Sequence, residues 1–195
     1  QNIITEDVKF KTKNKFSFEI DKKFNIKNII LNSEVNFDQL KYKKLDLIQN
    51  YLPDINELIL LNNHKINLKY KDKNLSIKGN GEIELIDNEV DQIEYLINGK
   101  DKDFSISSNL FIKNINLKKQ ELLKSFFPKI NEKIILNDQE LKIKYNKDNF
   151  SILGSGKFKI NKDFEEISYF LEKKNEKLKF NTDLNLKNTN FKIDN

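Results

Sequence analysis

The stretch that decides the fold reads NLSIKGNGEIEL and spans residues 74–85. Apolar residues and glycines occupy every second position, and serine, lysine, asparagine and glutamate fill the positions between them. A period of two is typical of a β-strand with one buried and one wet face, because successive side chains point to opposite sides. The sequence therefore predicts a half-buried strand whose apolar face carries two glycines, Gly79 and Gly81.

The same stretch recurs 75 residues later as NFSILGSGKFKI, at residues 149–160, with its glycines at Gly154 and Gly156. Flanking features recur at nearly the same spacing, among them a P-x-I-N-E motif and an I-x-Y motif. Tyr70 and Tyr145 also correspond, so the recurring tyrosines are expected to serve the fold. A repeat of this length indicates an array of similar units rather than independent domains.

We expect three parts in one continuous array. Residues 1–35 form the end of a preceding repeat, residues 36–117 the first full repeat and residues 118–195 the second. Alternating apolar and polar positions predict several antiparallel strands in each full repeat.

A short helix is expected at the start of each full repeat. Asn36 is a candidate N-cap with Gln39 three residues on, which is an imperfect capping box. Apolar residues between 40 and 52 then fall at helical spacing until Pro53 ends the pattern. The second helix is expected over residues 120–127, before Pro128.

A sheet with one apolar face must bury that face, because a single layer leaves it in water. The predicted fold is therefore mainly β: a repetitive, antiparallel, curled sheet shaped like a groove, with one short helix per repeat of about 75 residues. The glycine pairs are expected to let the sheet bend, or to let a helix or ligand approach the backbone closely.

Composition narrows the classes of function. Charged residues make up 33% of the chain, and the net charge is +5. Lysines and acidic residues are interspersed along the sequence rather than gathered in a basic block, so no nucleic-acid partner is expected. The chain has no cysteine, which excludes disulfides and thiol chemistry. It contains no methionine and begins at Gln1, so we expect a fragment or processed form whose leader or anchor lies outside it.

No residue cluster demands a reaction, so we expect no enzyme, cofactor or metal. His64 is the only histidine and has no partner at a suitable spacing. The Gly79-x-Gly81 pattern sits inside a strand and opens no helix, unlike a dinucleotide fingerprint. The acidic clusters at residues 87–91 and 163–166 lack the ligand spacing of a calcium loop.

The order of these features resembles the AsmA-like family, the group that includes AsmA, TamB and YhdP, and is closest to the YhdP-like repeat region. The resemblance covers most of residues 36–195 and depends on alternation and glycines rather than on a catalytic signature. It implies a protein on the periplasmic side of the bacterial envelope, anchored to the inner membrane by a segment outside this chain. Such a protein would bind phospholipid or another acyl-chain lipid in a β-groove and help carry it between the inner and outer membranes, supporting envelope integrity. The other implied partners are neighbouring repeats of the same chain and envelope proteins.

An apolar trough favours lipid because each exposed CH₂ of an acyl chain costs about 0.8 kcal/mol in water. The alternative is that the same side chains form a closed core, as apolar strand faces usually do, in a structural or adhesive β-repeat module that binds protein and no lipid. The residues expected to line the groove are Ile66, Leu68, Ile77, Ile83, Ile93, Phe104, Ile106, Leu110, Leu141, Ile143, Ile152, Phe158, Ile167, Phe180, Leu184 and Leu186.

Overall fold

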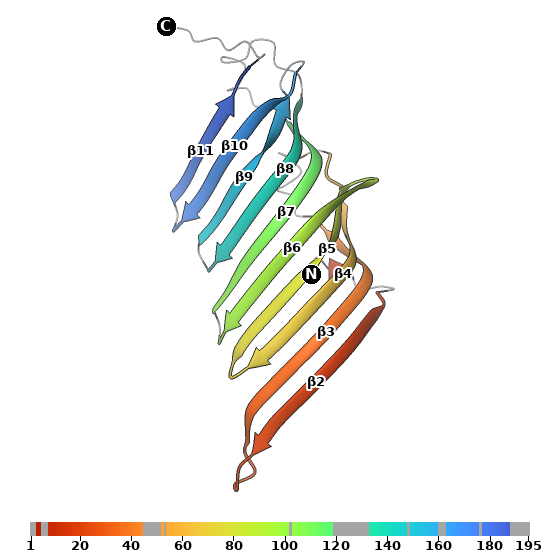
Figure 1. The fold of residues 1–195 in the computed structure, drawn as a ribbon, viewed down its shortest axis with the longest axis vertical. Helices are drawn as coiled ribbons and strands as arrows, with labels where there is room; N and C mark the ends of the chain where they lie inside the picture. The colour runs from red at the N-terminus through yellow and green to blue at the C-terminus, as the bar shows by residue number, and fades with distance from the viewer. Residues whose placement is uncertain are drawn as a thin grey trace.

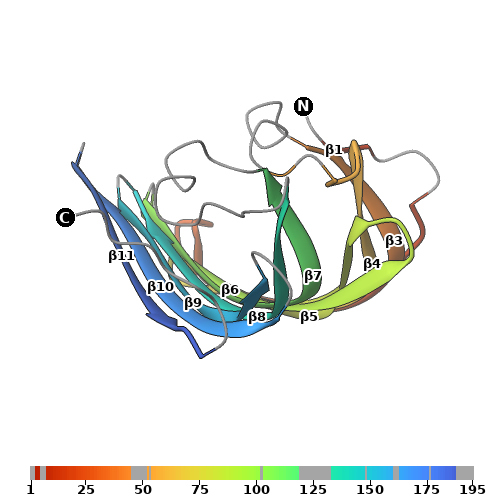
Figure 2. The same cartoon turned by 90° about the horizontal axis from the view of Figure 1, so that it is seen from above.

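The computed structural model describes residues 3–4, 8–44, 52, 54–101, 103–118, 133–147, 149–159, 163–175 and 177–187. Within these ranges the chain forms one antiparallel sheet of eleven strands and no helix (Figure 1). Seen along the direction in which the strands stack, the sheet is bowed and open rather than closed on itself or strongly curled (Figure 2). The prediction of a mainly β, antiparallel fold is confirmed.

Each strand from β2 to β10 pairs with the next one along the chain, and β1 pairs with the same edge of β3 as β2 does. Apart from β1, sheet neighbours are thus also sequence neighbours. The strands are β1 (Ile3–Ile4), β2 (Phe10–Ile20), β3 (Ile26–Lys43), β4 (Leu58–Lys71), β5 (Asn74–Ile86), β6 (Glu89–Lys100), β7 (Asp103–Lys118), β8 (Lys133–Asn146), β9 (Asn149–Lys159), β10 (Glu165–Lys174) and β11 (Lys177–Asn185).

The strand register gathers the apolar positions on one side of the sheet, which we call the apolar face. Residues directly opposite one another in an antiparallel pair share a face. Leu68 of β4 lies opposite Ile77 of β5, which in turn lies opposite Ile97 of β6. The opposite side, the polar face, carries mainly lysine, asparagine, serine and glutamate, as the alternation predicts.

The first predicted helix is wrong where the structure describes it, because residues 36–43 belong to strand β3. Asn36 and Gln39 resemble a capping box, and the apolar residues from Leu40 onward fall at helical spacing. In this part of β3 the apolar positions are instead Val35, Phe37, Leu40 and Tyr42, and the β3–β4 pairing keeps one register while it skips Asp38. Residues 45–50 and the second predicted helix, residues 120–127, lie outside the described residues.

A pair of β-bulges reproduces the sequence repeat in three dimensions. The pairing of β4 with β5 shifts at Asn63, and that of β8 with β9 shifts at Asp138, 75 residues later. Both residues have positive φ, 53° and 51°, as an inserted bulge residue often does. Each bulge adds one residue to its strand, and the apolar residues occupy odd positions on one side of the bulge and even positions on the other. Both halves of the strand therefore keep their apolar residues on the same face. The predicted boundary between residues 35 and 36 falls inside β3, and the repeat boundaries stay a prediction.

The hydrophobic core occupies only one half of the apolar face, the half beyond the bulges. The other half lies toward the β4–β5, β6–β7 and β8–β9 turns, and its apolar side chains are partly or largely exposed. The apolar face is therefore closed at one end of the strands and open at the other. The buried core residues are Ile55, Ile59, Ile83, Leu85, Ile112, Ile115, Ile134, Leu136 and Phe158.

Candidate functional site

The register brings the predicted lining residues together on the apolar face. Fifteen of the sixteen lie on strands that place them on this face, and Leu186 follows β11 directly. They divide between its two halves. Ile83 and Phe158 are buried in the core, and five more pack against it: Ile93, Leu110, Leu141, Ile167 and Leu186.

The remaining lining residues lie outside the core. Ile66, Leu68, Ile77, Ile106, Ile143 and Ile152 are partly buried. Phe104, Phe180 and Leu184 are 48%, 60% and 38% exposed.

One line of side chains crosses the open half of the apolar face, and we call it the apolar row. Its members lie opposite one another on six consecutive strands, β4 to β9. None of them is buried, and Tyr145 is 37% exposed. The apolar row consists of Leu68, Ile77, Ile97, Ile106, Tyr145 and Phe150.

The glycine pairs make room for side chains of neighbouring strands. A Cβ on Gly79 would lie 2.3 Å from the ring of Tyr95, and a Cβ on Gly81 would lie 2.4 Å from the ring of His64. Neither glycine has positive φ, and the pairing of β5 with β6 runs through both without a shift. The bulges lie on β4 and β8, next to the glycine-bearing strands β5 and β9. The glycines therefore do not form the bulges, and each pair instead leaves space in which two side chains pack against the backbone.

The two side chains that pack on the first glycine pair, His64 and Tyr95, are hydrogen-bonded to each other. His64 is 1% exposed, and its Nε2 donates to the backbone carbonyl of Glu82 at 3.0 Å. Its Nδ1 lies 3.3 Å from the Tyr95 hydroxyl and accepts from it when the ring is neutral. Phe37 stacks on the imidazole with ring centroids 4.9 Å apart. Burial lowers the pKa of His64 and raises that of Tyr95, so both groups are held neutral.

The second repeat makes the same arrangement with different chemistry. Gln139 takes the place of His64, and its Nε2 donates to the backbone carbonyl of Lys157 at 2.8 Å. The Tyr169 hydroxyl donates to Gln139 Oε1 at 3.2 Å, and the Tyr169 ring covers Gly154. The Gln139 amide and the His64 imidazole make equivalent hydrogen bonds. Their shared role is therefore to satisfy buried polar groups on an apolar face. Both nitrogens of His64 are engaged in the fold.

Two buried carboxylates hold the backbone of an adjacent strand or its continuation. Asp91 is 2% exposed and accepts the backbone N–H of Lys113 at 2.9 Å, while burial raises its pKa. Glu165, its counterpart 74 residues on, accepts the backbone N–H of Lys187 at 3.0 Å. These are the buried members of the acidic clusters seen in the sequence. The described residues contain no group of three or more His, Cys, Asp or Glu able to hold a metal ion.

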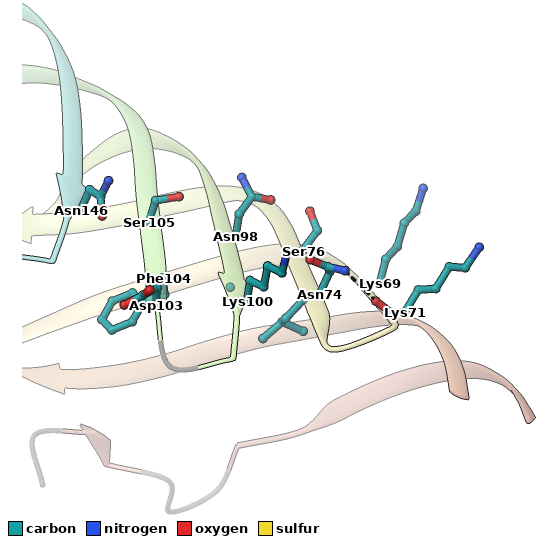
Figure 3. A pocket seen from close by; sticks show the side chains of 12 residues that line it. Lys69, Lys71, Asn74, Ser76, Asn98, Lys100, Asp103, Phe104, Ser105 and Asn146 are labelled. Carbon is teal, nitrogen blue, oxygen red and sulfur yellow. Dashed lines mark hydrogen bonds between the residues drawn. The ribbon is translucent and has the colours of Figure 1, made fainter. Parts of the chain in front are cut away.

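One described cavity lies mainly on the polar face, and Phe104 is the predicted lining residue that borders it. It has a volume of about 510 Å³ and is lined in part by Lys69, Lys71 and Lys100. Figure 3 shows Asn98 and Ser105 pointing to this side of the sheet and Phe104 to the other. Lysines and neutral amides can bind an anion, but this lining provides no buried polar side chain to fix one in place.

The pairing of glycines with cross-strand side chains was missed at the level of sequence, although its signals are present. The I-x-Y motif places Tyr95 directly opposite Gly79, and Tyr169 directly opposite Gly154. The signal would have been a tyrosine and a polar residue that both recur in step with the glycines.

No known protein family, curated protein or solved structure matches this chain. Among the described residues, no helix has the length and apolar character needed to cross a membrane.

Proposed function

We propose that the open half of the apolar face binds the acyl chains of phospholipid or a similar lipid. The observation that carries this proposal is the apolar row, six apolar side chains in register that remain accessible beside a closed core. Covering such a strip with an acyl chain is favourable by about 25 cal/mol for each Å² of apolar surface removed from water.

The length of the apolar row suits an acyl chain. Six strands spaced about 4.8 Å apart give a row roughly 24 Å long. Half the hydrocarbon thickness of a bilayer, the reach of one acyl chain, is about 15 Å. A chain can therefore lie across the strands along the row without bending back on itself.

The polar ends of the strands suit a headgroup. The apolar row lies close to the β4–β5 and β6–β7 turns, where Lys71, Lys73 and Lys100 are exposed. A lysine can keep its ammonium group in water beside a lipid phosphate while its stem lies on apolar surface.

We further propose the envelope role that the resemblance to the AsmA-like family implies. The protein would stand on the periplasmic side, joined to the inner membrane by a segment outside this chain, and help carry lipid toward the outer membrane. Neighbouring repeats would add strands at the edges of β2 and β11 and deepen the bow of the sheet into a groove.

The experiment is native mass spectrometry of the protein purified from bacterial cells without detergent. We expect phospholipid bound to the wild type and absent from Ile106→Asp, which places a charge in the middle of the apolar row. The matched control is Leu96→Asp, because Leu96 is 37% exposed but lies on the polar face. A wild type without lipid, or equal loss of lipid in both variants, would contradict the proposal.

A structural or adhesive β-repeat module that binds protein is the second candidate, and the buried core on half of the apolar face favours it. In that case Ile106 packs in the fold rather than against lipid. Ile106→Asp would then unfold the sheet, which circular dichroism would show, and the wild type would carry no lipid.

A further inference from the structure

The hairpin formed by β2 and β3 projects beyond the rest of the sheet. The pairing of β3 with β4 ends at Ile30 opposite Lys71, whereas the pairing of β3 with β2 continues to Ile26 opposite Ile20. The four extra residues carry the hairpin roughly 13 Å past its neighbour. This projecting tip, residues 18–28, is the lowest part of the sheet in Figure 1.

The projecting tip presents large apolar side chains to water. Phe24 is 88% exposed at the turn, and Ile20 and Ile26, opposite each other just behind it, are 57% and 58% exposed. Phe18 is 45% exposed. A single exposed apolar residue is ordinary, but a contiguous group on a projecting hairpin marks an interaction site.

The turn is built to hold Phe24 outward. The Asp21 carboxylate accepts the backbone N–H groups of Lys23 at 2.8 Å and Asn25 at 3.0 Å, and it pairs with the Lys27 ammonium at 2.8 Å. These contacts lower the pKa of Asp21 to about 2, with the Lys27 contact contributing most. The Phe24 backbone N–H donates to the Asp21 carbonyl, and Phe24 has a φ of 60°. A bulky residue seldom adopts this conformation, and such strain persists where the surroundings enforce it and function uses it.

The charges around the tip select a negatively charged partner. Lys22 and Lys23 are exposed and stand directly before Phe24. Of the two carboxylates of the tip, Asp21 is paired with Lys27, and Glu19 accepts a hydrogen bond from the neutral Asn28 amide, so the lysines outnumber the carboxylates by one. An aromatic side chain flanked by lysines is the combination that enters the interface of an anionic bilayer, with the ring at the level of the headgroups.

We propose that the projecting tip docks on an anionic lipid bilayer, with Phe24 inserted in the interface and Lys22 and Lys23 against lipid phosphates. A bilayer fits better than a folded protein because the tip offers a convex point rather than a surface with pockets. This docking uses none of the residues of the apolar row, so it stands or falls separately from the proposed lipid binding.

The chain contains no tryptophan, so Phe24→Trp introduces a single fluorescent reporter. We expect its emission to shift to the blue with vesicles of phosphatidylglycerol and phosphatidylcholine, and to change little with phosphatidylcholine alone. The control is Leu178→Trp, since Leu178 is 66% exposed beside the β10–β11 turn at the far edge of the sheet. No shift at Phe24→Trp, or an equal shift at both positions, would overturn the proposal and leave a protein partner as the alternative.

Two unlabelled variants test the roles of the ring and the lysines by vesicle sedimentation. Asparagine tolerates positive φ, so Phe24→Asn should keep or raise the melting temperature while vesicle affinity falls about tenfold. Lys22→Gln together with Lys23→Gln should lower affinity for anionic vesicles roughly tenfold and remove most of its salt dependence. Undiminished binding by Phe24→Asn would refute insertion.

Testing each variant in both assays distinguishes the two proposals. Ile106→Asp should lose bound phospholipid and still sediment with anionic vesicles. Phe24→Asn should keep bound phospholipid and sediment with anionic vesicles at about tenfold lower affinity.

Discussion

The residue scale is where the two repeats agree most closely. Gly79 and Gly154 each lie under a tyrosine ring, and Gly81 and Gly156 each lie under a buried polar side chain. A cross-strand aromatic ring over a glycine covers backbone that would otherwise be exposed, and it compensates for the missing side chain. The repeat thus conserves a contact between strands rather than a flexible point in one strand.

Gly79→Ala should lower the free energy of unfolding by about 1–3 kcal/mol, because the new Cβ would collide with the Tyr95 ring. Chemical denaturation measures the change. Gly99→Ala is the matched control, since its Cβ would have no neighbour closer than 3.7 Å and should cost little. Equal losses of unfolding free energy in the two variants would mean that space for the Tyr95 ring is not what Gly79 provides.

His64 should give the stability of the fold a dependence on pH. Burial lowers its pKa in the folded state below the ordinary value of 6.5, so below about pH 6.5 the unfolded chain binds a proton that the folded chain does not. Stability should therefore fall as the pH drops from 6.5, and it should not change through this residue above that value.

His64→Gln should flatten that dependence and keep the fold, because Gln139 already makes the same contacts in the second repeat. Denaturation curves of both proteins between pH 7.5 and 5, a range about the ordinary pKa of histidine, would show it. A variant with an unchanged slope would assign the pH dependence to other groups.

At the scale of the element, the bulges at Asn63 and Asp138 decide which side chains reach the apolar face. Leu61 and His64 are three residues apart in sequence yet share a face, since Asn63 is the extra residue between them. Without the bulge, one end of β4 would present its apolar side chains to the polar face.

Deleting Asn63 should therefore cost far more than changing it. The deletion turns Ile59 and Leu61 away from the core and should prevent cooperative folding, as thermal melts followed by circular dichroism would show. Asn63→Gly should be nearly neutral, because glycine adopts positive φ freely. A deletion variant that melts like the wild type would mean that the strand can slip without loss.

At the scale of the whole molecule, stability is unevenly spread across the sheet. The core residues come from strands β4, β5, β7, β8 and β9 and from the segment just before β4. Every residue of β2 and of β11 is exposed, and each of these strands pairs with one neighbour among the described residues. Repeat-like arrays held by nearest neighbours open from their ends.

Hydrogen exchange should show this gradient directly. Amides of β5 to β8 should exchange slowest, and those of β2 and β11 fastest, because opening an edge strand exposes little core. Mass spectrometry of peptic fragments measures it strand by strand. Equal protection at the edges and the centre would mean that the edges are covered in solution.

The sequence predicted the strands well because alternation is a local signal. It failed at residues 36–43, where Asn36 and Gln39 resemble a capping box and Leu40 begins an apolar spacing typical of a helix. Pairing with the neighbouring strand β4 makes this segment a strand, and the pattern of one segment alone does not reveal its partner.

The candidate site was predicted only in part for the same reason. Alternation placed the sixteen lining residues on one face, but it holds no information on how deeply each is buried. Ile83 and Phe104 occupy equivalent apolar positions in the alternating pattern. Tertiary packing buries Ile83 in the core and leaves Phe104 exposed in the open half.

The pairing of each strand with the next has a consequence for how this chain is made. A β-strand that needs only its predecessor can be added as soon as it leaves the ribosome, without waiting for a distant partner. Contacts so near in sequence carry a low entropic cost of closure, which shortens the time that an unfinished sheet exposes its apolar face. Synthesis and folding can thus advance together, one hairpin at a time, from β2 to β11.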